Sequence, residues 1–506
     1  MPEEAWSEVI SFLSDFGLLL PQTADDNRER WLDCHPLIRE YFANRLRETN
    51  LEAWRSAHLR LYESLKENTD YQPDTIEGLQ PLYQAVVHGC HAGVRYDAFI
   101  AVLGHRIFRV ELLRELQCEF FSASKLGAIG LNLSAVACFF ERRWSRVSSS
   151  LPDYHQAWLL NEAGFCLREL GRLQEAIEPF EVALKMGESA ENWLASTIRA
   201  SNVSELELTL GNVAGAIERA EQSVAFANRK SNRISKMCLP DTRASFLTTL
   251  ADALFQAGRR AEALAYYRQA EPEQSGGNPD KIILWSVQGF RYCDLLLGEF
   301  EPLVWRCRLI TDPLEQPAAI MGGEAVLNSN ASAAIQRCRQ VVQRTEQTLA
   351  AAKESLGLLD IALDHLTLSR AALFRSILER STSEGQGFEL NSHIAAALDG
   401  LRRSGNVTHV PMGLLTRACV RVIDSDVAGA RADLDEAWDI AERGPMRLHL
   451  ADIHLHRARL FFREKVYPWK SPQADLAAAE KLINDCGYHR RDQELADAKR
   501  AILGQG

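Results

Sequence analysis

Three side chains, His449, Asp452 and His456, have the types and the spacing that could do chemistry. They recur at i, i+3 and i+7 of a helical pattern and therefore share one helical face. Two imidazoles and a carboxylate are ligands that zinc or iron accepts. The two histidines, however, lie two turns apart, roughly 10.5 Å along the axis at 1.5 Å per residue. Because a single ion does not bridge that span, we predict solvated or core histidines and no metal.

Signatures of catalysis are missing from the sequence. It has no GxxxxGK[ST] loop to cradle phosphates and no GxSxG elbow to present a nucleophile. Asp364 and His365 are neighbours, but no serine or cysteine motif accompanies them. We therefore predict a protein that is not an enzyme and needs no cofactor. A hydrolase site without a familiar motif is the enzymatic alternative.

Composition and charge exclude several classes of protein. The 506 residues carry 57 Lys and Arg against 68 Asp and Glu, a net charge of −11, which argues against a nucleic-acid partner. The 11 cysteines are scattered singly without a CxxC pair, and the first residues are acidic where a signal peptide is basic. No apolar run approaches the ~18 residues of a membrane span. We expect a reduced, cytoplasmic protein without a membrane partner.

The elements that must position any site are helices, because apolar residues recur at i, i+3, i+4 and i+7 through most of the chain. Within this pattern a frame repeats in which a glycine turn is followed by alanine and then by an aromatic residue. The turn glycines are Gly171, Gly211, Gly258 and Gly298, and a late copy occupies Asp426–Ala430. This frame resembles the tetratricopeptide repeat (TPR), in which two helices form a hairpin. We predict an all-α fold, a TPR-like α-solenoid of such hairpins.

Side chains after each turn glycine fit close helix packing. Ala176, Ala216 and Ala263 let neighbouring helices approach, and Phe180 and Tyr267 fill the space beside them. The first helix of each hairpin then supplies the concave face of the solenoid. Amides and an arginine on adjacent repeats could hold an extended peptide there, although an ordinary solvated face is the alternative. The candidate peptide-binding or protein-binding residues are Trp158, Asn161, Phe165, Arg168, Asn202, Glu205, Thr248 and Asp252.

The first fifty residues differ from the rest of the chain. A short amphipathic helix at Trp6–Phe16, an apolar run at Gly17–Leu20, a polar turn, a second short run at Trp31–Cys34 and a helix from Pro36 suit the end of a winged helix, with its wing. We therefore predict five parts. They are a winged-helix-like remnant (1–48), a helical linker domain (49–150), a first TPR set (151–311), helical repeats with a loop insertion (312–405) and C-terminal TPR-like repeats (406–506).

Several stretches beyond the repeats resemble one bacterial family, the STAND-type (NACHT/NB-ARC-like) signalling ATPases with TPR C-terminal halves. These stretches are Cys34–Phe42, Pro81–Cys90, Trp158–Cys166, Ala451–Ala458, Tyr467–Pro472 and Asp485–His489. The resemblance implies that the repeats sense a trigger, often a foreign protein. It also implies that a nucleotide-binding ATPase domain, in cis or in trans, is a second partner.

His35 stands where that family has the histidine of a methionine-histidine-aspartate motif. The resemblance implies that His35 senses a nucleotide by contacting its β-phosphate. The methionine and aspartate positions are Cys34 and Pro36 here, so only the histidine carries over. The alternative is a histidine at a helix start that packs on the wing.

Together these observations predict a non-catalytic protein–protein interaction module that recognises a protein or peptide in a TPR groove. In the form that the resemblance implies, the chain is the sensor part of a STAND-type signalling or anti-phage (antiviral) defence system. The alternative is a DNA-binding transcription regulator that uses the winged helix. Its recognition helix, Leu37–Leu46, carries only Arg39 and Arg45 against Glu40, which is a weak basic patch.

Overall fold

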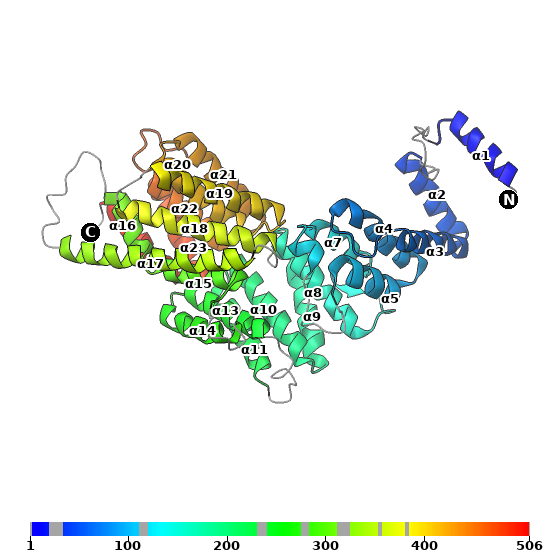
Figure 1. Cartoon of the computed structure of the whole chain (residues 1–506), viewed down its shortest axis with the longest axis horizontal. Coiled ribbons are helices and arrows are strands. Elements are labelled where there is room, and N and C mark those ends of the chain that lie inside the picture. Colours follow the sequence, from blue (N-terminus) through cyan, green and yellow to red (C-terminus); the bar gives the residue numbers. More distant parts are fainter. Residues whose placement is uncertain are drawn as a thin grey trace.

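A computed structural model shows a chain built almost wholly of helices (Figure 1). It describes residues 3–19, 34–110, 120–229, 240–274, 283–310, 324–352, 357–379 and 384–504. The only paired strands in these ranges are β1 (Phe140–Arg142) and β2 (Arg146–Val147), which form an antiparallel ribbon. The predicted all-α solenoid of helical hairpins is therefore confirmed. None of the helices in these ranges combines the length and the apolar composition needed to cross a bilayer.

The N-terminal helices lie at one end of the molecule (Figure 1). Leu19 and Cys34 form an isolated antiparallel bridge between the first two helices. Most of the predicted wing falls within residues 20–33, outside the described residues, so the winged helix stays a prediction. The second helix buries none of its residues. The bounds in this part are α1 (Glu3–Asp15), α2 (Pro36–Thr49), α3 (Leu51–Glu67), α4 (Ile76–Ala92), α5 (Arg95–Asp97), the π-helix η1 (Ala98–Phe108), α6 (Phe121–Ser124) and α7 (Ile129–Ala137).

Antiparallel hairpins follow, and each packs on the next. The first set is α8 (Asp153–Glu169), α9 (Leu173–Ser189), α10 (Trp193–Leu210), α11 (Val213–Ala227), α13 (Pro240–Gln256), α14 (Arg260–Gln274), α15 (Ser286–Gly298) and α16 (Glu301–Ile310). The later helices are α17 (Glu324–Ala352), α18 (Leu358–Glu379), α19 (Glu384–Arg403), α20 (Val410–Ile423), α21 (Val427–Arg443), α22 (Arg447–Phe461), α23 (Pro472–Cys486), the 3-10 helix η3 (His489–Arg491) and α24 (Asp492–Leu503).

The predicted packing inside the hairpins is present. Ala176, Ala216 and Ala263 are fully buried, as are Phe180 and Tyr267. A Cβ added at Gly164 would lie 2.7 Å from the ring of Phe180, so the small residue on α8 makes room for the aromatic residue on α9. Ala176 and Phe180 belong to a hydrophobic cluster that extends from the linker helices into the C-terminal repeats, whereas Ala263 and Tyr267 belong to a second cluster. The five predicted domain boundaries stay predictions.

Three of the four predicted turn glycines have the left-handed backbone that favours glycine. The φ angles are +73° at Gly171, +87° at Gly211 and +79° at Gly258. Gly298 is different, because it is the last residue of α15 and Glu299 after it continues in helical geometry (φ −60°). A Cβ at Gly298 would lie 2.7 Å from the ring of Phe255. The turn between α15 and α16 follows Gly298 directly, at Glu299 and Phe300, and at Gly298 itself close packing favours the glycine.

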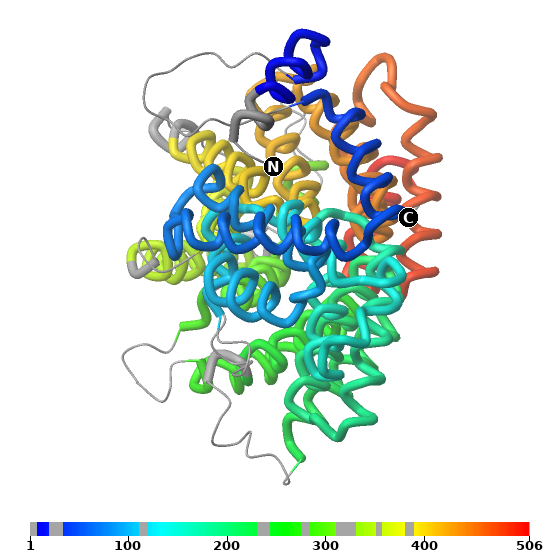
Figure 2. The backbone as a smooth tube through the Cα atoms, turned by 90° about the vertical axis from the view of Figure 1, so that its right-hand side faces the viewer, coloured from blue at the N-terminus to red at the C-terminus, as the bar shows by residue number. Residues whose placement is uncertain are grey.

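The C-terminal repeats pack back on the turns of the first hairpins (Figure 2). A Cβ at Gly211 would lie 2.7 Å from Cβ of Arg447 and 2.8 Å from Sγ of Cys486. A Cβ at Gly258 would lie 3.2 Å from Cβ of His489. The amide of Val407 donates a hydrogen bond to the carbonyl oxygen of Glu169 at 2.7 Å. The solenoid thus curls until its two halves touch, and its concave side becomes an interior.

This contact yields a prediction about Gly211. Gly211→Ala and Gly171→Ala both place alanine in a left-handed conformation, which costs roughly 1–2 kcal/mol. Only Gly211→Ala also clashes with α22 and Cys486, because the nearest atoms to a Cβ at Gly171 are 3.4 Å away. We expect Gly211→Ala to lower the free energy of unfolding by about 1 kcal/mol more than Gly171→Ala. Urea denaturation of both variants measures the difference, and equal losses would contradict a tight contact at Gly211.

Candidate functional site

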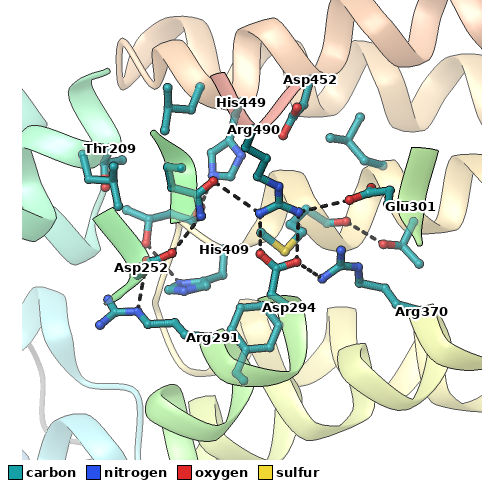
Figure 3. Close-up of a pocket in the computed structure, with 18 of the residues that line it drawn as sticks. Thr209, Asp252, Arg291, Asp294, Glu301, Arg370, His409, His449, Asp452 and Arg490 are labelled. Carbon is teal, nitrogen blue, oxygen red and sulfur yellow. Dashed lines mark hydrogen bonds and ion pairs between the residues drawn. The ribbon is translucent and has the colours of Figure 1, made fainter. Parts of the chain in front are cut away.

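The interior between the two halves of the solenoid holds a cavity of about 450 Å³, the first cavity (Figure 3). Its walls come from the first helices of successive hairpins, α8, α10, α13 and α15, and from α16, α18, α20, α22 and η3 on the opposite side. Pockets for small ligands and peptide segments have volumes of this order. The curl of the chain therefore turns the concave face into a partly enclosed binding space.

Charged side chains line one end of this cavity in alternating sign. Nη1 of Arg168 on α8 lies 2.6 Å from Oε2 of Glu205 on α10, and Nη2 of Arg291 on α15 lies 2.9 Å from Oε1 of Glu205. Burial alone would raise the pKa of Glu205, but the attraction of Arg291 and Arg168 outweighs it and holds that pKa at about 2. Glu205 is therefore an anion that links α8, α10 and α15, which belong to three different hairpins.

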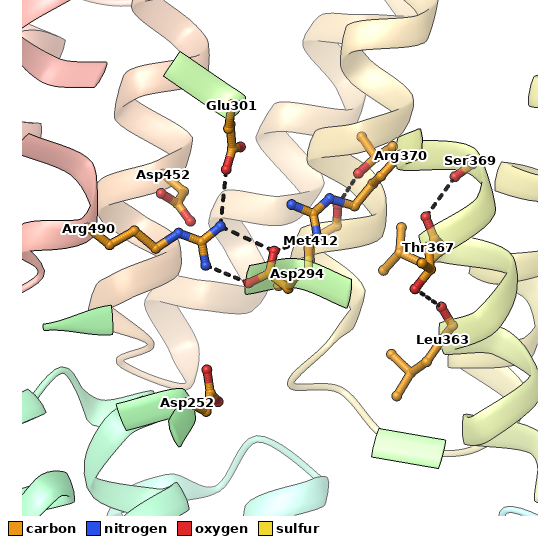
Figure 4. Close-up of polar contacts among 12 residues, drawn as sticks. Asp252, Asp294, Glu301, Leu363, Thr367, Ser369, Arg370, Met412, Asp452 and Arg490 are labelled. Atoms are coloured by element: carbon orange, nitrogen blue, oxygen red, sulfur yellow. Dashed lines mark hydrogen bonds and ion pairs between the residues drawn. The ribbon is translucent and has the colours of Figure 1, made fainter. Parts of the chain in front are cut away.

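A second group of charges ties the C-terminus to the middle of the chain (Figure 4). The guanidinium of Arg490 lies 2.5 Å from Oδ2 of Asp294 and 3.1 Å from Glu301, and Arg370 on α18 lies 2.7 Å from Oδ1 of Asp294. Arg491 pairs with Asp452 at 2.8 Å. Burial would raise the pKa of Asp294, but Arg490 and Arg370 lower it to about 2. The inner surface is thus set in place by buried ion pairs.

The histidines of the first cavity carry no charge at neutral pH. Burial, helped by Arg291, lowers the pKa of His409 to about 3, and its Nδ1 lies 2.9 Å from Oδ1 of Asn406. Burial, helped by Arg459, lowers the pKa of His456 to about 4, and its Nδ1 donates to the carbonyl oxygen of Asp452. Asp452 itself is paired with Arg491. His456 and Asp452 thus have partners in the core, and no cluster of three metal-ligating side chains occurs in the described part of the chain.

A second cavity of about 390 Å³ adjoins the first. The two share Phe165, Glu169, Asn202, Leu359 and Asn406 in their walls. The second cavity is bounded mainly by aromatic and aliphatic side chains of the segment after residue 119, of α8, of α10 and of α18. The first cavity has a charged end and the second has a largely apolar wall, so the combined space suits a ligand with a polar part and an apolar part.

Seven of the eight predicted site residues line these cavities. Arg168, Glu205 and Asp252 line the first, Trp158 and Asn161 the second, and Phe165 and Asn202 both. The amide of Asn202 donates to Oδ1 of Asn161 at 3.0 Å, and this contact joins α8 to α10.

Thr248 lies elsewhere, because its hydroxyl is fully buried and donates to the carbonyl oxygen of Ser245. The next residue, Thr249, contacts Glu205 at 3.3 Å instead. Thr248 thus lines neither cavity, and its role as a binding residue stays a prediction.

His35 lies apart from both cavities. It is exposed at the start of α2, where its Nδ1 accepts a hydrogen bond from the amide of Leu37 at 3.3 Å. That hydrogen bond is the ordinary role of an N-cap residue, which satisfies a free amide in the first helical turn. A role for His35 in sensing a nucleotide stays a prediction.

Sequence reasoning missed the charged residues of the later repeats, among them Arg291, Asp294, Arg370 and Arg490. Arg490 and Arg491 look like helix-end charges in the sequence, but both are enclosed in ion pairs. A usable signal was present, since charged residues interrupt the apolar pattern of α15 and α18 at positions that a hairpin must bury. The sequence did not show which of these charged residues pair with one another.

Comparison with known proteins adds little to this geometry. No protein-family model matches the chain, and no curated protein matches it. One solved structure that is similar is described as the crystal structure of a Rap protein complexed with competence and sporulation factor. The match covers 92% of this chain and 96% of that chain at 10% identity, with a TM-score of 0.33. Because both values are low, we draw neither fold nor function from it.

Proposed function

We propose that this chain is a non-catalytic interaction module, a sensor that holds a peptide segment of a partner protein in its interior. The observation that carries the proposal is the pair of adjoining cavities, of about 450 and 390 Å³, on the inner side of the repeats. Ion pairs hold the walls in place before a ligand arrives, which lowers the entropy lost on binding. Backbone amides and side chains of a peptide would find both polar and apolar walls there.

The resemblance seen in the sequence supports a finer proposal. In this form the module works in the cytoplasm as the sensor part of a STAND-type signalling or anti-phage defence system. A nucleotide-binding ATPase domain, in cis or in trans, would receive the signal, and His35 would contact its nucleotide. Binding of the trigger would shift the balance between two arrangements of the module and that domain. The DNA-binding alternative gains nothing from α2, whose exposed side chains include the apolar Leu37, Tyr41 and Phe42.

The test compares a double variant, in which two polar side chains of the cavity walls become apolar, with a matched control. Asn161→Leu with Asn202→Leu replaces a hydrogen-bonded pair by two apolar side chains, so neither partner is left unpaired. Asn391→Leu makes the same change at an exposed amide on α19 that lines neither cavity. Each protein is mixed with a synthetic library of random hexapeptides, and native mass spectrometry identifies the peptides that stay bound.

We expect the wild-type protein and Asn391→Leu to retain the same peptides and the double variant to lose them. Loss of the buried polar contacts should weaken binding by on the order of 30-fold. Retention of the same peptides by the double variant would contradict binding in the cavities. Cleaved peptides in the spectra of the wild-type protein would contradict the non-catalytic assignment.

A further inference from the structure

The second cavity has aromatic walls. Trp158 and Phe165 on α8 line it together with Phe120. The rings of Phe120 and Trp158 are nearly parallel, at 9°, with centroids 6.2 Å apart. Phe99 and Phe108 pack behind Trp158, at centroid distances of 5.4 and 6.0 Å. The indole is therefore held in one orientation, and its neighbours keep the wall rigid.

One carboxyl group in this wall lacks a counter-charge. Glu162 on α8 is 3% exposed, and its hydrogen-bond partner is the thiol of Cys166, 3.5 Å from Oε1. No ion pair joins Glu162 to a cation in the part of the chain that the structure describes. The other buried acids of α8 and α10 differ, because Glu169 and Glu205 both pair with Arg168. A buried carboxylate without a cation is costly, so its presence on a cavity wall needs a reason.

The charges around the cavity also favour a cation. The acidic side chains in its wall are Glu162, Glu169 and Asp360, whereas Arg199 is the basic one. Arg168 already neutralises Glu169 from outside this wall. Burial, followed by the repulsion of Glu169, raises the pKa of Glu162 to about 7, which reports the same missing positive charge. The carboxylate of Glu162 would repel a negatively charged ligand. A neutral ligand would leave this carboxylate without a counter-charge.

We propose that the second cavity recognises a protonated amine on an apolar body, with the ammonium group at Glu162 and the body against the rings of Trp158 and Phe165. An ammonium group gains from both neighbours at once, since aromatic faces attract cations and a carboxylate pairs with them. A metal ion is a poor occupant, because the described residues supply no third ligand.

This inference rests on the proposed function, in which the cavities hold a peptide. The cation would be the N-terminal amine or a lysine side chain of that peptide. The shared wall at Phe165 and Asn202 would let the rest of the chain continue into the first cavity. A free organic amine has the same chemistry, so the test separates the two sources.

The probes are 3-phenylpropylammonium and its neutral counterpart 3-phenylpropanol, titrated by calorimetry into the full chain. Glu162→Gln removes the charge and keeps the shape, and Glu178→Gln makes the same change at an exposed position on α9. We expect Glu162→Gln to weaken binding of the ammonium probe by on the order of 30-fold and to leave the alcohol unchanged. Glu178→Gln should behave as the wild-type protein. Equal affinity of the two probes for the wild-type protein would overturn the proposal.

The peptide arm repeats the hexapeptide screen with an N-acetylated library and with a library in which norleucine replaces lysine. Loss of binding in one of them identifies the amine that enters the cavity. One outcome is that peptides bind with an affinity that is unchanged by N-acetylation, by norleucine in place of lysine and by Glu162→Gln. That result would overturn the amine site and leave the proposed function standing. If no peptide binds but the ammonium probe binds through Glu162, the amine site stands for a free amine and the peptide function fails.

Discussion

Asp294→Ala is expected to lower the free energy of unfolding by about 3–5 kcal/mol, the largest effect of any single substitution proposed here. The carboxylate of Asp294 is the shared partner of Arg370 and Arg490, whose side chains are 8% and 6% exposed. Alanine would remove the ion pair of Arg370 with Asp294 and leave Arg490 paired with Glu301 alone among the described residues, so two nearly buried cations would lose their shared counter-charge. Urea denaturation followed by circular dichroism measures the loss.

Glu175→Ala is the matched control for this experiment. Glu175 also pairs with an arginine, Arg172 at 2.6 Å, but on the surface, where the two side chains are 47% and 35% exposed. Surface pairs of this kind contribute about 0–1 kcal/mol, so the control should be nearly neutral. An equal, small loss in both variants would show that the inner ion pairs do not hold the two halves of the solenoid together.

Glu162→Gln is expected to stabilise the free protein, and only at neutral and alkaline pH. The folded protein raises the pKa of Glu162 from 4.5 to about 7 because burial disfavours the charged form. The folded state therefore binds a proton more tightly than the unfolded state, so stability is complete below pH 4.5 and declines as the pH rises through 7. The shift corresponds to a loss of roughly 3 kcal/mol above pH 7, which glutamine avoids.

The measurement compares urea midpoints of the wild-type protein and Glu162→Gln at pH 5 and pH 8. The other titratable groups that face this carboxyl are Cys166 and Glu169 on α8, Arg199 on α10 and Asp360 on α18, and both proteins keep them. We expect similar midpoints at pH 5 and a higher midpoint for the variant at pH 8. The same midpoints at both values would mean that Glu162 has a cationic partner when the protein is folded. A gain of stability together with lost affinity for amines would mark the carboxyl as a binding group.

The features that the sequence predicted correctly depend on interactions between residues close together in the chain. Gly171, Gly211 and Gly258 mark turns because a left-handed residue favours glycine wherever the hairpin is placed. The concave face followed from the same frame, and it placed Asn161, Arg168, Glu205 and four further residues on cavity walls. The same frame did not show that Thr248 is buried, with its hydroxyl bonded to the carbonyl oxygen of Ser245. At Gly298 a turn follows the glycine directly, but the need for glycine comes from the ring of Phe255 and not from a left-handed backbone.

The sequence by itself therefore determined the helices, their pairing into hairpins and the inner face of the first repeats, because those depend on residues within about forty positions of each other. Only the tertiary structure decided which charges meet. Arg490 and Asp294 are 196 residues apart and pair because small rotations between successive hairpins add up to a curl that brings the C-terminal repeats back onto the earlier hairpins. The same curl brings Leu359 and Asn406 to the second cavity, whose wall includes Glu162. The sum of those rotations depends on every interface in the series, which no local pattern of residues records.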